Sequence, residues 1–251
     1  MTKKEVGHNF LARLGKKRLR PGGITATNWL IKEGRFSRDS QVLEVACNRC
    51  TTSIELAQTF GCQIKGIDQD RRALEEVRKS IQAAHLEEFI QVQEGNAMKL
   101  PFPDNSFDIV VNEAMLTMLS EKAKIKAVKE YYRVLKPGGR LLTHDVSFSD
   151  KHLEDKLTQL RQTINANVSP LHVDKWQELF KSCGFSQVNY HTGKMTLMSI
   201  TGMIKDEGLL GACRIFYRGM KKDNRQQFLK MYGFFNKTGK ELGYIAVASQ
   251  K

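Results

Sequence analysis

The chain has 251 residues, of which 41% are hydrophobic and 27% are charged, a composition that suits one large domain with an insertion. It contains no run of about 18 apolar residues, which excludes a transmembrane helix. The basic N-terminus lacks the apolar core of a signal peptide, and five scattered cysteines make no disulfide framework, so we expect a cytoplasmic protein.

The net charge of +13 is concentrated in two segments. Residues 1–20 carry +6 and residues 194–240 carry +7, so the rest of the chain is neutral. Such segments suit an anionic substrate, an anionic membrane surface or nucleic acid, and also the solvated faces of ordinary helices.

Strands and helices alternate between residues 40 and 190, a pattern typical of a parallel sheet with crossover helices. Apolar runs predict strands at 41–45, 63–67, 89–93, 107–111, 140–146 and 187–191. Helical periodicity predicts helices at about 52–60, 71–84, 120–135, 150–165 and 175–183. Thr52 and Glu55 form the capping box expected to open the first helix, and Ser120 is the expected N-cap of the third.

A last strand is predicted at 242–249, after about fifty residues with helical character. Asp223 and Gln226 predict a capping box in that segment, and four glycines predict a short or bent helix near 200–220. The predicted fold is a Rossmann-like α/β fold, a doubly wound and mostly parallel seven-stranded sheet with a helical insertion before the last strand. Its expected parts are a basic helical cap (1–40), the core (41–193), the insertion (194–240) and the final strand (241–251).

Polar groups follow four of the predicted strands, at the edge where open parallel sheets bind ligands. In chain order they are Glu44 with the loop 46–50, Asp68, Asn96 with Ala97, and Asn112 with Glu113. Asp68 lies twenty residues beyond Asn48, a spacing at which a carboxylate accepts both hydroxyls of a ribose.

The sequence resembles class I S-adenosylmethionine (SAM) methyltransferases, particularly the branch that contains ubiquinone- and menaquinone-biosynthesis enzymes. The matching stretches span roughly residues 20–190 in the family's order and spacing; they are 42–50, 66–68, 94–97, 100–108 and 133–139. The resemblance implies a SAM-dependent methyltransferase with S-adenosylhomocysteine as product and a small-molecule acceptor. It also implies a cofactor site made of Arg20, Glu44, Ala46, Asn48, Asp68, Gln69, Asn96, Ala97 and Glu113.

The resemblance gives these residues different parts of the cofactor. Asp68 would hold the ribose, while Gln69 and Asn96 would lie beside the adenine. Glu44 and the following loop would face the methionine part, whose carboxylate Arg20 would pair with.

Three glycines of the family's first motif are replaced here by Ala46, Asn48 and Cys50. Asn is among the non-glycine residues that best tolerate a left-handed backbone, whereas Cys50 is the replacement most in conflict with cofactor binding, since its side chain is expected to point into the cofactor space. A dinucleotide needs glycines in this loop so that its pyrophosphate can lie against the backbone. SAM carries no phosphate, so the altered loop favours SAM over NAD.

Methyl transfer is an in-line displacement in which positioning and desolvation supply much of the rate, and a general base helps where the acceptor bears a proton. Glu113 and His144, at the ends of two neighbouring strands, are the candidate bases. The alternative without a catalytic role is a cofactor-proximal or surface carboxylate for Glu113 and a packed or solvent-facing ring for His144. Asp145 lies in the same region, and His8, His172 and Tyr190 become candidates only if their segments fold over the site. The spacing of Cys47 and Cys50 is also that of a metal or redox pair, but no second Cys/His pair lies nearby, so no metal site is predicted.

The insertion at 194–240 is predicted to act as a lid that selects the acceptor, or alternatively to extend the core or form a homodimer contact. An RNA or nucleobase methyltransferase would use the basic segments to bind nucleic-acid phosphates. Residues 111–114, however, lack the motif with which many base amino-methyltransferases hold a flipped base, so nucleic acid is not favoured. Two further alternatives are a non-catalytic SAM-binding protein and an enzyme with peripheral membrane contact through the insertion.

Overall fold

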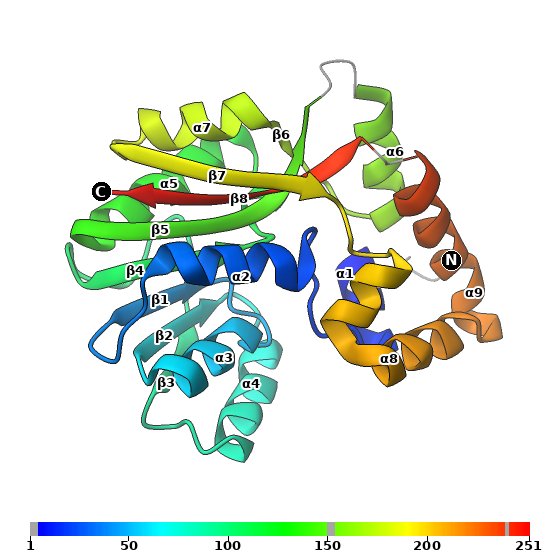
Figure 1. The fold of residues 1–251 in the computed structure, drawn as a ribbon, viewed down its shortest axis with the longest axis horizontal. Helices are drawn as coiled ribbons and strands as arrows, with labels where there is room; N and C mark the ends of the chain where they lie inside the picture. The colour runs from blue at the N-terminus through cyan, green and yellow to red at the C-terminus, as the bar shows by residue number, and fades with distance from the viewer. Residues whose placement is uncertain (1–4, 150–153, 239–240) are drawn as a thin grey trace.

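The computed structural model describes residues 5–149, 154–238 and 241–251. Its strands form one sheet in the order β3-β2-β1-β4-β5-β8-β7, and a two-residue strand, β6, pairs with the end of β5 (Figure 1). Their bounds are β1 Gln41–Val45, β2 Gln63–Asp68, β3 Ile90–Glu94, β4 Phe107–Glu113, β5 Leu135–Phe148, β6 Leu171–His172, β7 Gln187–Lys194 and β8 Leu242–Gln250. Only β8 runs antiparallel to its neighbours, so the mostly parallel Rossmann-like sheet is confirmed, with β6 as a short eighth strand.

Helices cover both faces of this sheet and one end of it. The α-helices are α1 Gly7–Leu14, α2 Gly23–Gly34, α3 Thr51–Phe60, α4 Arg71–Ala83, α5 Glu121–Val134, α6 Glu154–Ile164, α7 Val173–Ser182, α8 Ile200–Gly219 and α9 Lys222–Gly233. Apolar side chains of α2, α3 and α4 pack on one face, and those of α5 and α7 pack on the other. None of the helices in the described part of the chain is long and apolar enough to cross a membrane.

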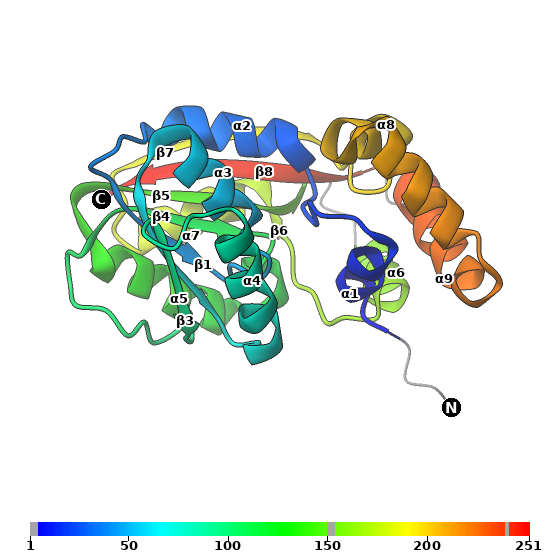
Figure 2. The same cartoon turned by 90° about the horizontal axis from the view of Figure 1, so that it is seen from below.

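The remaining helices form a third apolar cluster beyond the end of the sheet. Side chains of α1, α6, α8 and α9 share this cluster, which we call the terminal cluster. Figures 1 and 2 place the four helices together at the end of the molecule away from the N-terminal ends of the parallel strands. Segments far apart in the sequence therefore build a second small core.

The insertion begins and ends in an antiparallel hairpin of β7 and β8, so its predicted place before the last strand is confirmed. Lys194, the last residue of β7, pairs with Gly243 near the start of β8. Helix α8 is bent at Gly208, where φ is 74° and ψ is 168°, and this confirms the bend predicted from the glycines. The short π-helical turn Phe234–Thr238 follows α9.

Local capping was predicted with mixed success. The Ser120 hydroxyl accepts from the backbone N–H of Ala123, so that N-cap is confirmed. The capping box at Thr52 is wrong, because α3 begins one residue earlier and the Thr52 hydroxyl donates to Glu113 instead. The box at Asp223 is also wrong: α9 begins at Lys222, without a side-chain cap.

Candidate active site

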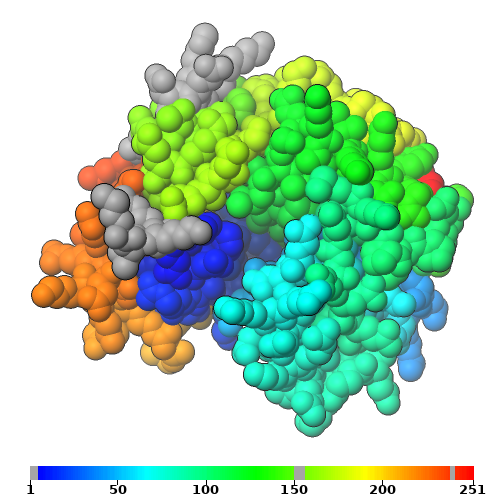
Figure 3. Space-filling view, turned by 180° about the vertical axis from the view of Figure 1, so that it is seen from behind, coloured from blue at the N-terminus to red at the C-terminus, as the bar shows by residue number. Residues whose placement is uncertain are grey.

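A cavity of about 280 Å³ lies at the carboxyl ends of β1, β4 and β5, next to the reversal of strand order between β1 and β4. At one end the walls are polar, formed by Arg20, Glu44, Asn48, Asp68 and Glu113 together with the loop after β1. At the other end they are apolar and come from the terminal cluster and its surroundings: Leu11, Leu160, Ile164, Val168, Met195, Leu197, Met231 and Phe235. In Figure 3 the blue N-terminal residues lie between the yellow-green α6 and the cyan and green core.

Glu113, the last residue of β4, joins three segments at the polar end. One carboxylate oxygen forms an ion pair with Arg20 Nη1 at 2.9 Å and accepts a hydrogen bond from the Thr52 hydroxyl at 2.7 Å. The other accepts from the Thr27 hydroxyl at 3.0 Å and lies 3.3 Å from His144 Nδ1. Burial alone would raise the pKa of Glu113, but the charge of Arg20 and the bonds from His144 and Thr52 outweigh it and lower the pKa to about 2. Such a carboxylate is ionised and fully bonded, so this geometry supports a positioning role rather than proton abstraction.

His144 lies on β5 behind Glu113 and is fully buried. Its Nε2 accepts from the backbone N–H of Gly22 at 2.9 Å, so the ring proton must sit on Nδ1 and point toward Glu113. Both ring nitrogens are therefore occupied, and the side chain does not line the cavity. The geometry supports a role for His144 in fixing the turn before α2.

Glu44, on β1, lines the cavity and is almost fully buried. One of its carboxylate oxygens accepts from the Ser53 backbone N–H at 3.1 Å and from the Ser53 hydroxyl, in the first turn of α3. Burial raises its pKa to about 7, although Arg20 and the bonds from Ser53 act in the opposite direction. The polar end thus holds two buried glutamates, Glu44 with a pKa above the ordinary 4.5 and Glu113 with a pKa below it.

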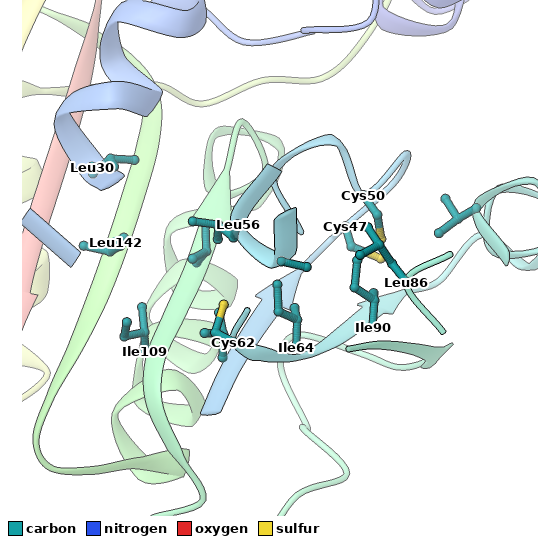
Figure 4. Packing of buried hydrophobic residues seen from close by; sticks show 14 of the residues in the cluster. Leu30, Cys47, Cys50, Leu56, Cys62, Ile64, Leu86, Ile90, Ile109 and Leu142 are labelled. Atoms are coloured by element: carbon teal, nitrogen blue, oxygen red, sulfur yellow. The ribbon is translucent and has the colours of Figure 1, made fainter. Parts of the chain in front are cut away.

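The loop after β1 keeps the backbone shape that glycines would give it. Ala46, Asn48 and Cys50 all have positive φ, at 56°, 43° and 49°. Cys50 points away from the cavity and packs in the apolar cluster beside Cys47 (Figure 4). The bond from Cys47 and burial both raise the pKa of the Cys50 thiol, which stays protonated. The Cys50 side chain therefore does not enter the space where the cofactor was predicted.

Asp68, at the end of β2, lies at the edge of the cavity. One of its oxygens accepts from the backbone N–H of Asn48 at 2.9 Å and the other from that of Asp70, also at 2.9 Å. Each oxygen keeps a second lone pair, so the carboxylate fixes the loop and can still accept further hydroxyl donors.

Three predicted cofactor residues lie outside the cavity lining. Gln69 and Asn96 are exposed, and Ala97 is half-buried. The Asn96 side chain accepts from the backbone N–H of Met98 and forms a local turn. Their contacts with an adenine ring remain predictions.

Two titratable side chains lie nearer the apolar end. Asp145, on β5, lines the cavity, is fully buried and accepts from the backbone N–H groups of Thr117 and Val146. Burial raises its pKa. His8 on α1 also lines the cavity, and partial burial lowers the pKa of its ring, which is therefore neutral near pH 7. Sequence reasoning found both residues, but it missed the contribution of α6 to the walls, for which the sequence carries no motif.

Comparison with known proteins bears directly on this arrangement. A family model described as a methyltransferase domain matches residues 43–143, from β1 into β5. A demethylmenaquinone methyltransferase of Listeria welshimeri is 28% identical and covers 76% of this chain and 93% of its own length. Residues 43–143 therefore belong to a methyltransferase domain, and the fold that contains them is that of the class I SAM-dependent enzymes.

Two other proteins are similar to this chain over nearly its whole length. An uncharacterised protein of Haemophilus influenzae is 55% identical over the full length of both chains. The structure of phosphoethanolamine N-methyltransferase 2 of Haemonchus contortus, in complex with phosphomonomethylethanolamine and S-adenosylhomocysteine, covers 98% of this chain and 57% of its own length, with a TM-score of 0.77. At 17% identity the latter similarity establishes the fold alone.

Proposed function

We propose that the protein transfers the methyl group of SAM to an apolar small molecule held between α1, α6 and the insertion. The observation that carries this proposal is the continuity of one cavity from the loop after β1 to the apolar walls of the terminal cluster. Burying the acceptor there would exclude water from the reaction and fix the direction of attack.

The residues at the polar end fit the cofactor that the family uses. Asp68 has acceptor capacity for ribose hydroxyls, and the Glu44 carboxyl, with a pKa near 7, can ionise beside an ammonium group. Bound SAM would supply an electrophilic methyl group on a positively charged sulfur. Arg20 and Glu113 would hold the N-terminal segment against this site through their ion pair.

At the apolar end, Asp145 and His8 are the groups placed to take a proton from the acceptor. Burial raises the pKa of Asp145, which makes its carboxylate a stronger base, and lowers the pKa of His8, which keeps its imidazole uncharged and able to accept a proton. An acceptor with an apolar body and an acidic hydroxyl or an amine would match this end of the cavity.

Isothermal titration calorimetry with SAM and S-adenosylhomocysteine tests the cofactor site first. Both should bind, and Asp68→Ala should weaken binding about ten-fold or more, because hydrogen bonds to a charged group are lost. Asp68→Asn, which keeps one acceptor oxygen, should fall between the two. Asp39→Ala, an exposed carboxylate just before β1 at the opposite edge of the sheet, is the matched control and should bind as the parent does. Failure of the parent protein to bind either compound would refute the proposal.

A further inference from the structure

The exposed apolar side chains of this protein are concentrated on α8. Among the described residues, six of the ten large apolar side chains that are exposed lie on this helix or directly after it: Ile200, Ile204, Leu209, Leu210, Tyr217 and Met220. Leu210 is 81% exposed and Leu209 is 64% exposed, values that no packing within this chain explains. Exposed apolar side chains gathered on one element in this way indicate an interaction surface.

The patch occupies a defined face of the helix. Beyond the bend at Gly208, Leu210, Cys213, Arg214 and Tyr217 follow one another at helical spacing and are all exposed. The opposite side of the same turns packs inward through Ala212, Ile215 and Gly219. Figures 1 and 2 show α8 and α9 together at the end of the molecule opposite the C-terminus.

The charges of α8 are sorted between its two sides. Its carboxylates are turned inward: the Asp206 side chain is 1% exposed and the Glu207 side chain 3% exposed, and both lie close to the buried Lys16 ammonium. The exposed residues of α8, of the turn that follows it and of the start of α9 include Lys205, Arg214, Arg218, Lys221 and Lys222. The outward face therefore combines apolar side chains with cations whose nearest acids on the helix are already paired. We call it the outer α8 face.

We propose that the outer α8 face docks the protein on an anionic lipid bilayer. Leucine and tyrosine side chains gain free energy by entering the boundary between headgroups and acyl chains, and the interleaved cations are attracted to lipid phosphates. A second copy of the chain would bring the same cations against each other, which disfavours a symmetric dimer through this face. Nucleic acid would satisfy the cations but would leave the leucines in water. This inference does not depend on the methyl-transfer proposal.

Co-sedimentation of the full chain with vesicles tests the proposal. The protein should bind vesicles made of equal parts phosphatidylglycerol and phosphatidylcholine, and should bind poorly to phosphatidylcholine alone. The double variant Leu210→Ser/Arg214→Glu should lower the partition coefficient about ten-fold or more, since it removes an inserting side chain and reverses a charge. The matched control is Ile125→Ser/Lys126→Glu, which changes the same two kinds of exposed side chain on α5 and should have no effect.

Several outcomes would overturn the proposal. The first is no binding to anionic vesicles, and the second is an equal loss in the α8 and α5 variants. A concentration-dependent dimer that Leu210→Ser abolishes, without vesicle binding, would assign the face to a second copy. Binding of a single-stranded oligonucleotide that Arg214→Glu abolishes and Leu210→Ser leaves unchanged, again without vesicle binding, would assign it to nucleic acid. Because SAM titration is independent of lipid, these results are separable from the cofactor test.

Discussion

At the scale of single residues, the loop after β1 keeps a glycine-like path without glycines. For a side chain larger than hydrogen, the left-handed backbone region costs about 1–2 kcal/mol. Asn48 bears this cost most easily, whereas Ala46 and Cys50 have no polar group that compensates for it. Strain of this kind is common at ligand-binding loops, where the surrounding structure holds the backbone in place.

Replacing Ala46 by glycine should relieve part of this strain. We expect Ala46→Gly to raise the free energy of unfolding by about 0.5–1 kcal/mol, because relief of the left-handed conformation exceeds the entropy that glycine adds to the unfolded chain. Urea denaturation measures the change. Ala83→Gly, in the last turn of α4 with ordinary backbone angles, should shift stability in the opposite direction. A loss of stability in both variants would contradict the strain argument.

The two buried carboxyl groups respond to pH in opposite ways. Glu113 has a lowered pKa, so its stabilising effect is present above about pH 4.5 and is lost as the pH falls toward 2. Glu44 has a raised pKa of about 7, so it carries no penalty below its unfolded value near 4.5. As the pH rises from 4.5 to 7, ionisation of Glu44 increasingly destabilises the folded state.

This difference predicts a pH-dependent gain for Glu44→Gln. At pH 8 the variant should exceed the parent in free energy of unfolding by about 3–3.5 kcal/mol, because the pKa of Glu44 rises from 4.5 to about 7 and each unit corresponds to about 1.4 kcal/mol. At pH 4.5 the two proteins should be nearly equal. Urea denaturation at the two pH values measures the change, and a difference that is the same at both would show that Glu44 does not titrate as inferred.

At the scale of secondary-structure elements, the core was predictable because periodicity and strand ends are local properties. The alternation between residues 40 and 190 predicted the sheet, and the rule for strand ends brought Glu44, Asp68 and Glu113 to one cavity. The capping box at Thr52 failed because its hydroxyl bonds a carboxylate on β4, a contact across sixty-one residues that no local pattern encodes. The walls supplied by α6 and the bond from Gly22 to His144 could not be predicted for the same reason.

Asp206 is the contact that fastens α8 to the N-terminal segment. Its carboxylate binds Lys16 Nζ at 2.9 Å and the backbone N–H of Ile24, in the first turn of α2, at 2.8 Å. Glu207 holds the neighbouring backbone by accepting from the N–H groups of Lys17 and Arg18. The segment between α1 and α2, which lines the cavity, is thus held by acids of the insertion.

Asp206→Ala should loosen that segment. We expect a loss of about 3 kcal/mol in stability, because the buried Lys16 ammonium loses its nearest partner, together with faster amide hydrogen exchange between residues 7 and 24. Glu94→Ala is the control, since it breaks an exposed pair with Arg71 and should cost less than about 1 kcal/mol. Unchanged exchange in residues 7–24 would mean that other contacts hold the segment.

At the scale of the whole molecule, charge and hydrophobicity are divided between its two ends. The described parts of the two basic segments, 5–20 and 194–238, meet in the terminal cluster, while the neutral core carries most of the end of the cavity that we assign to the cofactor. In the proposed function, one end of the molecule binds the cofactor. The other end carries both the apolar walls around the acceptor and the outer α8 face. If the outer α8 face lies on a bilayer as we propose, an acceptor that partitions into lipid would reach the apolar end of the cavity from the same end of the molecule.

The pairing of Lys194 with Gly243 also bears on how such a protein diversifies. Two adjacent strands hold both ends of the insertion at a fixed short separation, and closing a longer or shorter loop between them changes the entropy only slowly with length. Replacement of the intervening helices therefore leaves the register of the sheet intact. The helices that we propose to hold the acceptor can therefore differ between related proteins, while the strand ends that we propose to hold the cofactor stay the same.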